Sequence, residues 1–281
     1  MSDRLLTWEE AVRWLKAQPD RQALVQHCYY DDPLQAAAER FSRSQEWQAL
    51  AQLLKAHLPG EVLDLGAGRG ISSYAFAKAG YSVTALEPDP SNLVGVGAIR
   101  SLIESSHLPI QIVQNYGEAL PFEDGTFNVV YGRAVLHHAQ ALKQLCQESA
   151  RVLKPGGMFI ATREHVLSKK SDLQQFLDAH PLHFLYGGEN AYLLSEYKTA
   201  IQAAGLKLRR TMGPLDNVIN YSPMTRAEFQ TEVATALSRH VGKYLGSWLA
   251  NQQIVQQGYG RYRSLRSHTP GRLYSFLAVK P

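Results

Sequence analysis

The chain has 281 residues, of which 45% are hydrophobic and 19% charged, a composition typical of a globular protein with a sizeable core. No apolar run approaches the roughly 18 residues of a membrane span, and residues 1–20 lack the apolar stretch of a signal peptide. The net charge is +4, and all 25 acidic residues precede residue 233. Two cysteines, Cys28 and Cys146, form neither a disulfide framework nor a zinc-spaced cluster, so we expect a cytoplasmic protein without a metal site.

Residues 1–57 are expected to form a helical cap. Apolar residues recur at helical spacing, and helices are predicted over 7–17, 22–29, 33–41 and 44–57. After Pro59-Gly60 the pattern changes to short apolar runs that alternate with helical stretches. That alternation indicates β-α units and a mainly parallel sheet over 58–281.

Seven strands are predicted, at 61–65, 82–87, 110–115, 127–131, 158–163, 206–211 and 273–279. Helices are expected between them at 71–78, 91–105, 140–153, 171–179 and 195–204. A helical insertion or lid over 214–271 precedes the last strand, and a capping box from Thr225 to Glu228 opens a helical stretch that runs to about residue 255.

The first predicted strand ends in a glycine loop, Gly66-Ala67-Gly68-Arg69-Gly70, and a helix begins immediately after it. Glycines permit a tight turn and a close approach of ligand to backbone, while a helix start favours an anionic group. Glu87 ends the next strand, where a carboxylate can bind ribose hydroxyls. The alternative is an ordinary tight turn with a solvent-exposed acid.

The spacing of the loop departs from the dinucleotide pattern, because its third glycine comes one residue early. Asp64, two residues before Gly66, suits an ammonium group better than a pyrophosphate. A ligand with an amino-acid end and a nucleoside end, such as S-adenosylmethionine, therefore fits best.

The chain resembles the class I S-adenosylmethionine-dependent methyltransferases, in the branch typified by ubiquinone and menaquinone biosynthesis enzymes. The resemblance rests on segments 62–70, 86–89, 117–122, 127–138 and 151–157, which stand in the order found in that family. It implies a Rossmann-like, mainly parallel seven-stranded sheet with an antiparallel last strand. It is weak outside about residues 60–160, where substrates are chosen.

The resemblance also implies residue roles for the cofactor. The loop and Asp64 would hold the methionine end, with Arg133 lining it, and Glu87 would bind the ribose hydroxyls. The full expected set is Asp64, Gly66, Ala67, Gly68, Gly70, Glu87, Pro88, Glu118, Ala119 and Arg133. Many relatives have Asp where this chain has Gly117, so another residue is expected to recognise the adenine amino group. An N-terminal helix often closes over the cofactor, which makes Tyr29, Tyr30 and Arg40 further candidates, with ordinary helix packing as the alternative for each.

A hydroxyl acceptor must lose a proton during methylation, and histidine is the usual base. His165 and His138 follow predicted strands whose carboxyl ends face the site, and they are our candidate catalytic residues. The loop over 180–190 is rich in polar and aromatic residues. The expected acceptor-binding residues are Glu164, His183, Tyr186, Glu189 and Asn190. The alternatives are a polar strand end, a helix start and a surface turn.

These observations predict methyl transfer from S-adenosylmethionine to a small-molecule acceptor at oxygen. The rivals are an RNA methyltransferase that uses the basic, aromatic C-terminal region, and a non-catalytic S-adenosylmethionine-binding protein. That C-terminal region also fits a solvated helix face or a lid over an anionic substrate. Amino-methylating DNA enzymes, C5-cytosine enzymes and arsenite methyltransferases are disfavoured because their characteristic motif or cysteines are missing.

Overall fold

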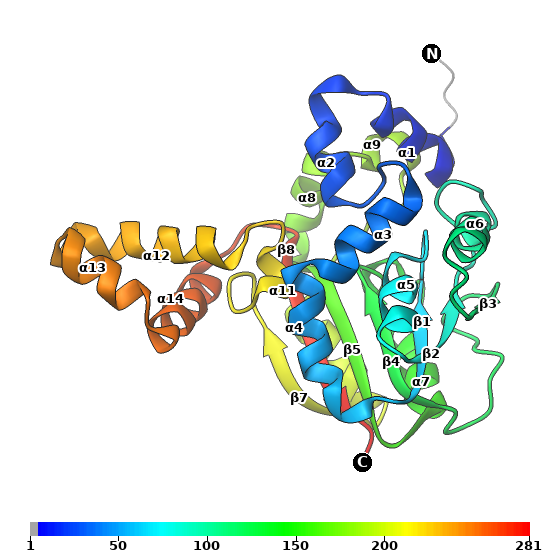
Figure 1. The fold of residues 1–281 in the computed structure, drawn as a ribbon. Helices are drawn as coiled ribbons and strands as arrows, with labels where there is room; N and C mark the ends of the chain where they lie inside the picture. The colour runs from blue at the N-terminus through cyan, green and yellow to red at the C-terminus, as the bar shows by residue number, and fades with distance from the viewer. Residues whose placement is uncertain (1–4) are drawn as a thin grey trace.

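The structure, a computed structural model that describes residues 5–281, is an α/β fold built on one mixed sheet (Figure 1). The sheet has eight strands in the order β3-β2-β1-β4-β5-β8-β7, and β6 pairs with β5 outside this order. The strands are β1 (Glu61–Leu65), β2 (Ser82–Leu86), β3 (Ile110–Val113), β4 (Phe127–Arg133), β5 (Leu153–Leu167), β6 (Tyr192–Leu193), β7 (Lys207–Met212) and β8 (Arg272–Val279). None of the described helices is long and apolar enough to cross a membrane.

The expected Rossmann-like sheet with an antiparallel last strand is confirmed, since β8 runs antiparallel to both β5 and β7 while the remaining pairs are parallel. The expected count of seven was one short, because β6 is only two residues long and carries no strand pattern of its own. Strand β5 is longer than the predicted 158–163 at both ends. It begins at Leu153, which pairs with Phe127, and a bulge between Ala161 and Glu164 lets it continue beside β8.

Helices cover both faces of the sheet. They are α1 (Trp8–Lys16), α2 (Gln22–His27), α3 (Leu34–Arg43), α4 (Gln45–Leu54), α5 (Ile71–Lys78), α6 (Val96–Ser106), α7 (Leu142–Val152), α8 (Leu173–Ala179), α9 (His183–Tyr186), α10 (Leu194–Ala203), α11 (Val218–Tyr221), α12 (Arg226–Val241), α13 (Lys243–Ala250) and α14 (Gln253–Arg266). Short 3-10 turns occur at Pro19–Arg21, Lys55–His57, Leu136–His138 and Lys170–Asp172.

The core has two main layers because successive strand residues point to opposite faces. On one face, Val129 and Tyr131 of β4 pack with residues of α3, α4, α5 and α11. On the other face, Val130 packs with residues of α7 and α10. This double covering explains why the central strands are apolar throughout.

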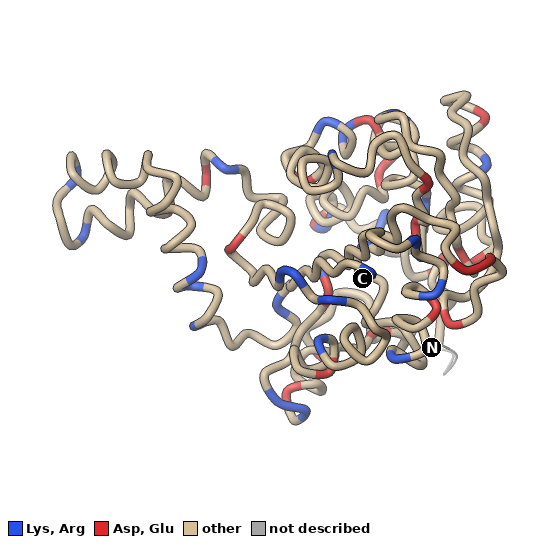
Figure 2. The backbone as a smooth tube through the Cα atoms, turned by 90° about the horizontal axis from the view of Figure 1, so that it is seen from below, with Lys and Arg blue, Asp and Glu red and all other residues tan. Residues whose placement is uncertain are grey.

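Helices α12 to α14 form an arm that projects from the body, and the chain returns from it into β8 (Figure 1). A single helical stretch was predicted from 225 to about 255. The stretch is broken instead, because Gly242 adopts a positive φ of 83° between α12 and α13. Figure 2 shows Lys and Arg positions along this arm.

Candidate functional site

A cavity of about 510 Å³ lies at the carboxyl ends of the central strands, where ligands bind in open α/β sheets. The volume falls in the range of small-molecule sites. Two groups of residues on its wall matter here. The glycine-loop side follows β1 and β2 and consists of residues 66–69 with Glu87 and Pro88. The histidine side consists of His137 and His138 after β4, His165 on β5, and His180 and Glu189 from the segment over 180–190.

The glycine loop turns sharply because Gly66 and Gly68 have φ values of +56° and +55°. The Ala67 amide donates to the Leu86 carbonyl at 3.0 Å and ties the loop to β2. A Cβ on Gly68 would find no atom nearer than the Val94 carbonyl at 3.8 Å, so this part of the loop is open to a ligand. A Cβ on Gly66 would lie 2.8 Å from a methyl group of Val135. The loop therefore presents bare backbone to the cavity.

Glu87 follows β2 on the same side and is 7% exposed. One carboxylate oxygen accepts the Gly68 amide at 2.7 Å, and the other accepts the Asp89 amide at 2.9 Å. Burial raises the pKa of Glu87 to about 7. A buried carboxyl group that already orders the loop is thus placed to accept hydrogen bonds from ligand hydroxyls.

Asp64 and Gly70 lie behind the loop rather than on the cavity wall. The Asp64 carboxylate accepts the hydroxyls of Ser72 and Ser73 at 2.7 and 2.5 Å. Burial raises its pKa to about 6. Gly70 begins α5 with a φ of +81°. Their contacts in the structure are with the loop and the helix, so their direct effect is to shape the loop.

Of the expected cofactor residues Glu118 and Ala119, which by the family resemblance would flank the adenine, one lies on the cavity wall. Glu118 lines the cavity and accepts the Gln140 amide at 3.0 Å, whereas Ala119 is not among the lining residues. Pro88 and Gly117 also line it.

Arg133, at the end of β4, lines the cavity between the two sides. Its guanidinium donates to both carboxylate oxygens of Glu46 at 2.7 and 3.2 Å and lies over the rings of Tyr29 and Phe41. Glu46 is 2% exposed and comes from α4. Glu46 carries no signal in the sequence, because an acid in the first turn of a helix looks like an ordinary solvated residue.

The turn after β4 separates two neighbouring histidines. His137 is buried, and its Nδ1 lies 2.7 Å from Glu164 Oε2. The same carboxylate accepts the backbone amides of Val135 and His137, each at 3.1 Å. His138 also lines the cavity but is exposed, with Nδ1 3.2 Å from the Gly188 carbonyl. Both histidines follow a predicted strand, and His138 was the candidate base, while the geometry places His137 deeper, on the buried side of the turn.

His165 lies on β5 just beyond the bulge, where Arg163 has a φ of +60°. Its Nδ1 lies 2.7 Å from the Gly271 carbonyl, which only accepts hydrogen bonds, so Nδ1 carries the proton and Nε2 a free lone pair. Burial lowers the pKa of His165 to about 4, which keeps the ring neutral near pH 7.

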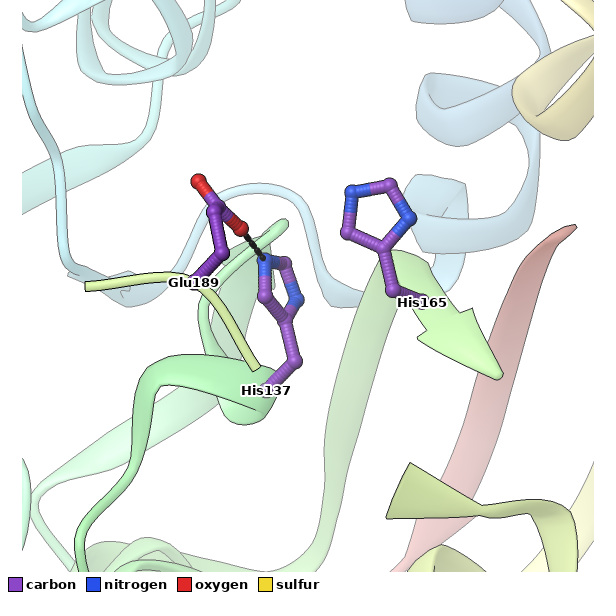
Figure 3. A group of neighbouring side chains, drawn as sticks. All are labelled: His137, His165 and Glu189. Atoms are coloured by element: carbon purple, nitrogen blue, oxygen red, sulfur yellow. Dashed lines mark ion pairs between the residues drawn. The ribbon is translucent and has the colours of Figure 1, made fainter. Parts of the chain in front are cut away.

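The segment over 180–190 brings Glu189 to the histidine side. One oxygen of Glu189 accepts the Tyr186 hydroxyl and lies 3.5 Å from His180 Nε2. The other oxygen, Oε2, lies 3.9 Å from His137 Nε2 and has no hydrogen-bond partner (Figure 3). Burial alone would raise the pKa of Glu189, but the surrounding histidines and the Tyr186 hydroxyl hold it below its usual range.

Three of the five expected acceptor-binding residues lie away from the cavity wall. Glu164 is fully buried beneath His137, and neither His183 nor Asn190 lines the cavity. Tyr186 and Glu189 do line it.

The N-terminal helices cover the cavity. Trp8 of α1 packs against Tyr186 with ring centroids 4.7 Å apart, and the Leu6 amide donates to the Leu185 carbonyl at 2.9 Å. Tyr29 and Tyr30 line the cavity. Arg40 does not; it pairs with Asp31 at 2.6 Å.

Comparison with known proteins identifies a methyltransferase domain at residues 63–161. The chain is 28% identical over 170 residues to a ubiquinone biosynthesis O-methyltransferase from Rhizobium etli, covering 57% of this chain and 67% of that protein. It is 27% identical over 146 residues to the uncharacterized methyltransferase YcgJ from Bacillus subtilis, covering 49% of this chain and 53% of that one.

Solved structures agree on the fold. A putative sarcosine dimethylglycine methyltransferase from Galdieria sulphuraria matches 89% of this chain and 90% of its own with a TM-score of 0.55 at 20% identity. A geranyl diphosphate methyltransferase in complex with SAM matches 91% of this chain and 95% of its own with a TM-score of 0.56 at 15% identity.

Proposed function

We propose that this chain, which carries a methyltransferase domain at residues 63–161, transfers a methyl group from S-adenosylmethionine to an oxygen atom of a small-molecule acceptor. One observation carries the proposal. The cavity joins a bare glycine loop and a buried carboxyl group to a histidine, His165, whose ring is neutral and whose Nε2 is free.

The glycine-loop side fits the cofactor. Gly68 leaves open space where a side chain would stand, and Glu87 offers a carboxylate for two neighbouring hydroxyls. We assign cofactor contact to the backbone of 66–68 and to Glu87, Pro88, Glu118 and Arg133. Asp64, Gly70 and Ala119 would act by shaping these contacts. When bound, S-adenosylmethionine supplies a methyl group on a positively charged sulfur, which is already an activated leaving group.

The histidine side suits a hydroxyl acceptor. A neutral imidazole with a free Nε2 can take the proton of a hydroxyl, and His165 presents that nitrogen to the cavity. His138, at the exposed rim, is the second candidate base. Tyr186 and Glu189 would orient the acceptor, with Glu164, His183 and Asn190 supporting them. The oxygen preference is supported by the Rhizobium relative, which is named an O-methyltransferase.

The cover over the cavity favours a small acceptor. The expected helical cap over 1–57, of which residues 1–4 lie outside the described part of the chain, places Trp8, Tyr29 and Tyr30 on the wall, and Leu6 and Trp8 contact the segment over 180–190. An acceptor enclosed in this way is held in one orientation, which is the main requirement of an in-line transfer. The two unpaired cysteines, Cys28 and Cys146, are compatible with the reducing cytoplasm that we propose as its setting.

The test begins with calorimetry of the purified chain and S-adenosylhomocysteine, with NADH as control. We expect micromolar binding of the first and none of the second. A panel of phenols, hydroxy acids and their amine counterparts is then screened for S-adenosylhomocysteine formation, and we expect turnover with hydroxyl acceptors. Turnover confined to amines would overturn the oxygen assignment, and binding of NADH alone would overturn the cofactor.

A further inference from the structure

Three side chains of the histidine side form a compact group of nitrogen and oxygen atoms. His137, His165 and Glu189 come from the turn after β4, from β5 and from the loop after α9, and one ligand atom of each lies within 4.8 Å of the others (Figure 3). His137 Nε2 and Glu189 Oε2 are 3.9 Å apart. Neighbouring ligand atoms around a four-coordinate metal lie about 3.4 Å apart for bonds of about 2.1 Å, so this pair needs to close by about half an ångström, and no pair of the group by more than about 1.4 Å.

The second nitrogen of each ring has the partner that metal-binding histidines usually have. His137 Nδ1 faces the Glu164 carboxylate at 2.7 Å, and backbone amides hold that carboxylate from two further directions. His165 Nδ1 faces the Gly271 carbonyl, also at 2.7 Å. A carboxylate or a backbone carbonyl on the far nitrogen fixes the ring and directs the lone pair of Nε2 to a metal.

Glu189 supplies an independent observation. Its side chain is 4% exposed, and its Oε2 has no hydrogen-bond partner while its other oxygen is occupied by Tyr186. A buried, unpartnered carboxylate oxygen is costly and needs an explanation. A cation at the point between Glu189 and the two histidines would satisfy it.

We propose that His137, His165 and Glu189 bind one divalent first-row transition-metal ion in the catalytic cavity. Two imidazoles and one carboxylate suit zinc, cobalt or ferrous iron, whereas magnesium and calcium prefer oxygen ligands throughout. The proposal reverses the expectation of no metal site. The sequence hid the group because its members are separated by 28 and 24 positions and show no local ligand spacing.

The site also defines the acceptor more closely, a step that rests on the proposed function. Three protein ligands leave coordination positions open toward the cavity. A small molecule with a hydroxyl beside a second oxygen, such as a catechol or a hydroxy acid, would fill them as a chelate. A cation would lower the pKa of a bound hydroxyl, and while His165 Nε2 is on the ion the hydroxyl proton would go to His138, the second candidate base on the cavity wall, or to solvent water.

The experiment uses the untagged full chain, stripped with a chelator and titrated with Zn²⁺, Co²⁺ and Mg²⁺. We expect one equivalent of Zn²⁺ or Co²⁺ to bind, with a change in the visible absorption of Co²⁺, and no competition from millimolar Mg²⁺. His165→Ala and Glu189→Gln should each weaken Zn²⁺ binding at least 100-fold. Glu164→Gln should weaken it 10- to 100-fold through His137.

The matched control is His240→Ala, an exposed histidine near the end of the arm helix α12, which should leave stoichiometry and affinity unchanged. S-adenosylhomocysteine binding serves as the check that each variant is folded. No Zn²⁺ or Co²⁺ binding by wild-type chain that binds S-adenosylhomocysteine would overturn the metal site, as would tight binding retained by both His165→Ala and Glu189→Gln. A chain that binds Zn²⁺ but shows no methyl transfer would instead overturn the proposed function.

Discussion

The two sides of the cavity are built in different ways. On the glycine-loop side, a short continuous segment carries its own conformation, because Gly66 and Gly68 adopt positive φ and Glu87 clamps the Gly68 amide. On the histidine side, the same space is enclosed by residues from β4, β5 and the loop after α9. One side is therefore encoded locally, whereas the other exists only after the chain has folded. Changes on the first should alter cofactor affinity, and changes on the second should alter turnover.

The largest effect is expected from Glu87→Ala. It removes the carboxylate that orders the loop and that we assign to the ribose hydroxyls, at about 1.5–3 kcal/mol for each hydrogen bond to a charged group. S-adenosylhomocysteine affinity should fall at least 100-fold in calorimetry. His165→Ala should change this affinity less than threefold and abolish turnover. Equal losses of cofactor affinity in both variants would show that the two sides are not separable.

A pair of glycines gives a more finely matched comparison. Gly66 and Gly271 both have positive φ, and a Cβ would meet Val135 at 2.8 Å in the first case and Phe176 in the second. Alanine at either position should cost about 2–4 kcal/mol of stability from backbone strain and overpacking. Gly66→Ala should lower S-adenosylhomocysteine affinity about tenfold. Gly271→Ala should spare that affinity and lower turnover, because the Gly271 carbonyl holds His165.

Thermal unfolding measures the loss of stability in each glycine variant, and Gly125→Ala is the control. Gly125 has a φ of +66° with no atom near its Cβ, so it carries the strain without the contact. If Gly125→Ala destabilised the protein as much as Gly66→Ala, the close contact with Val135 would have no measurable cost.

The two sides of the cavity also differ in how much of each could be predicted from the sequence. The strand before Gly66, the loop and Glu87 were all found from spacing, since each depends on backbone geometry over a few residues. Glu46 and the Gly271 carbonyl were not found, and the sequence did not show which of the neighbours His137 and His138 faces inward. Their positions depend on a turn that sends His137 inward and His138 outward, on a bulge at Arg163, and on an arm that returns the chain at residue 271. Each is a product of long-range packing that leaves no pattern in the sequence.

The pH dependence of cofactor binding provides a further test of the glycine-loop side. Burial raises the pKa of Glu87 to about 7, and hydrogen bonds from hydroxyls favour the ionised form. Below pH 7 a proton must leave on binding, so S-adenosylhomocysteine affinity should rise up to tenfold per pH unit from pH 5 to 7 and then level off. Glu87→Gln should bind more weakly and lose most of this rise.

The raised pKa of Glu87 also predicts how the stability of the folded protein changes with pH. An acid whose pKa is raised in the folded state binds its proton more tightly there, so its contribution to stability declines as pH rises from about 4.5 to 7. Thermal unfolding should show Glu87→Gln gaining on the wild type over that interval. A constant difference would mean that Glu87 ionises normally in the folded protein.

The smallest effect is expected outside both sides, on the basic arm. Arg261 and Arg266 lie on α14, remote from the cavity lining, and Arg266 lies over the ring of Tyr262 on the same helix. Replacing both with Gln should change stability by no more than about 0.5 kcal/mol and turnover of a small acceptor less than twofold. An RNA acceptor would behave differently, because lost phosphate contacts weaken binding and reduce its salt dependence. Filter binding of RNA at 50 and 200 mM salt, compared between the double variant and the wild type, separates these outcomes. If RNA binding depends on salt and the substitutions weaken it, the acceptor is an RNA bound by the arm and not a small molecule bound in the cavity.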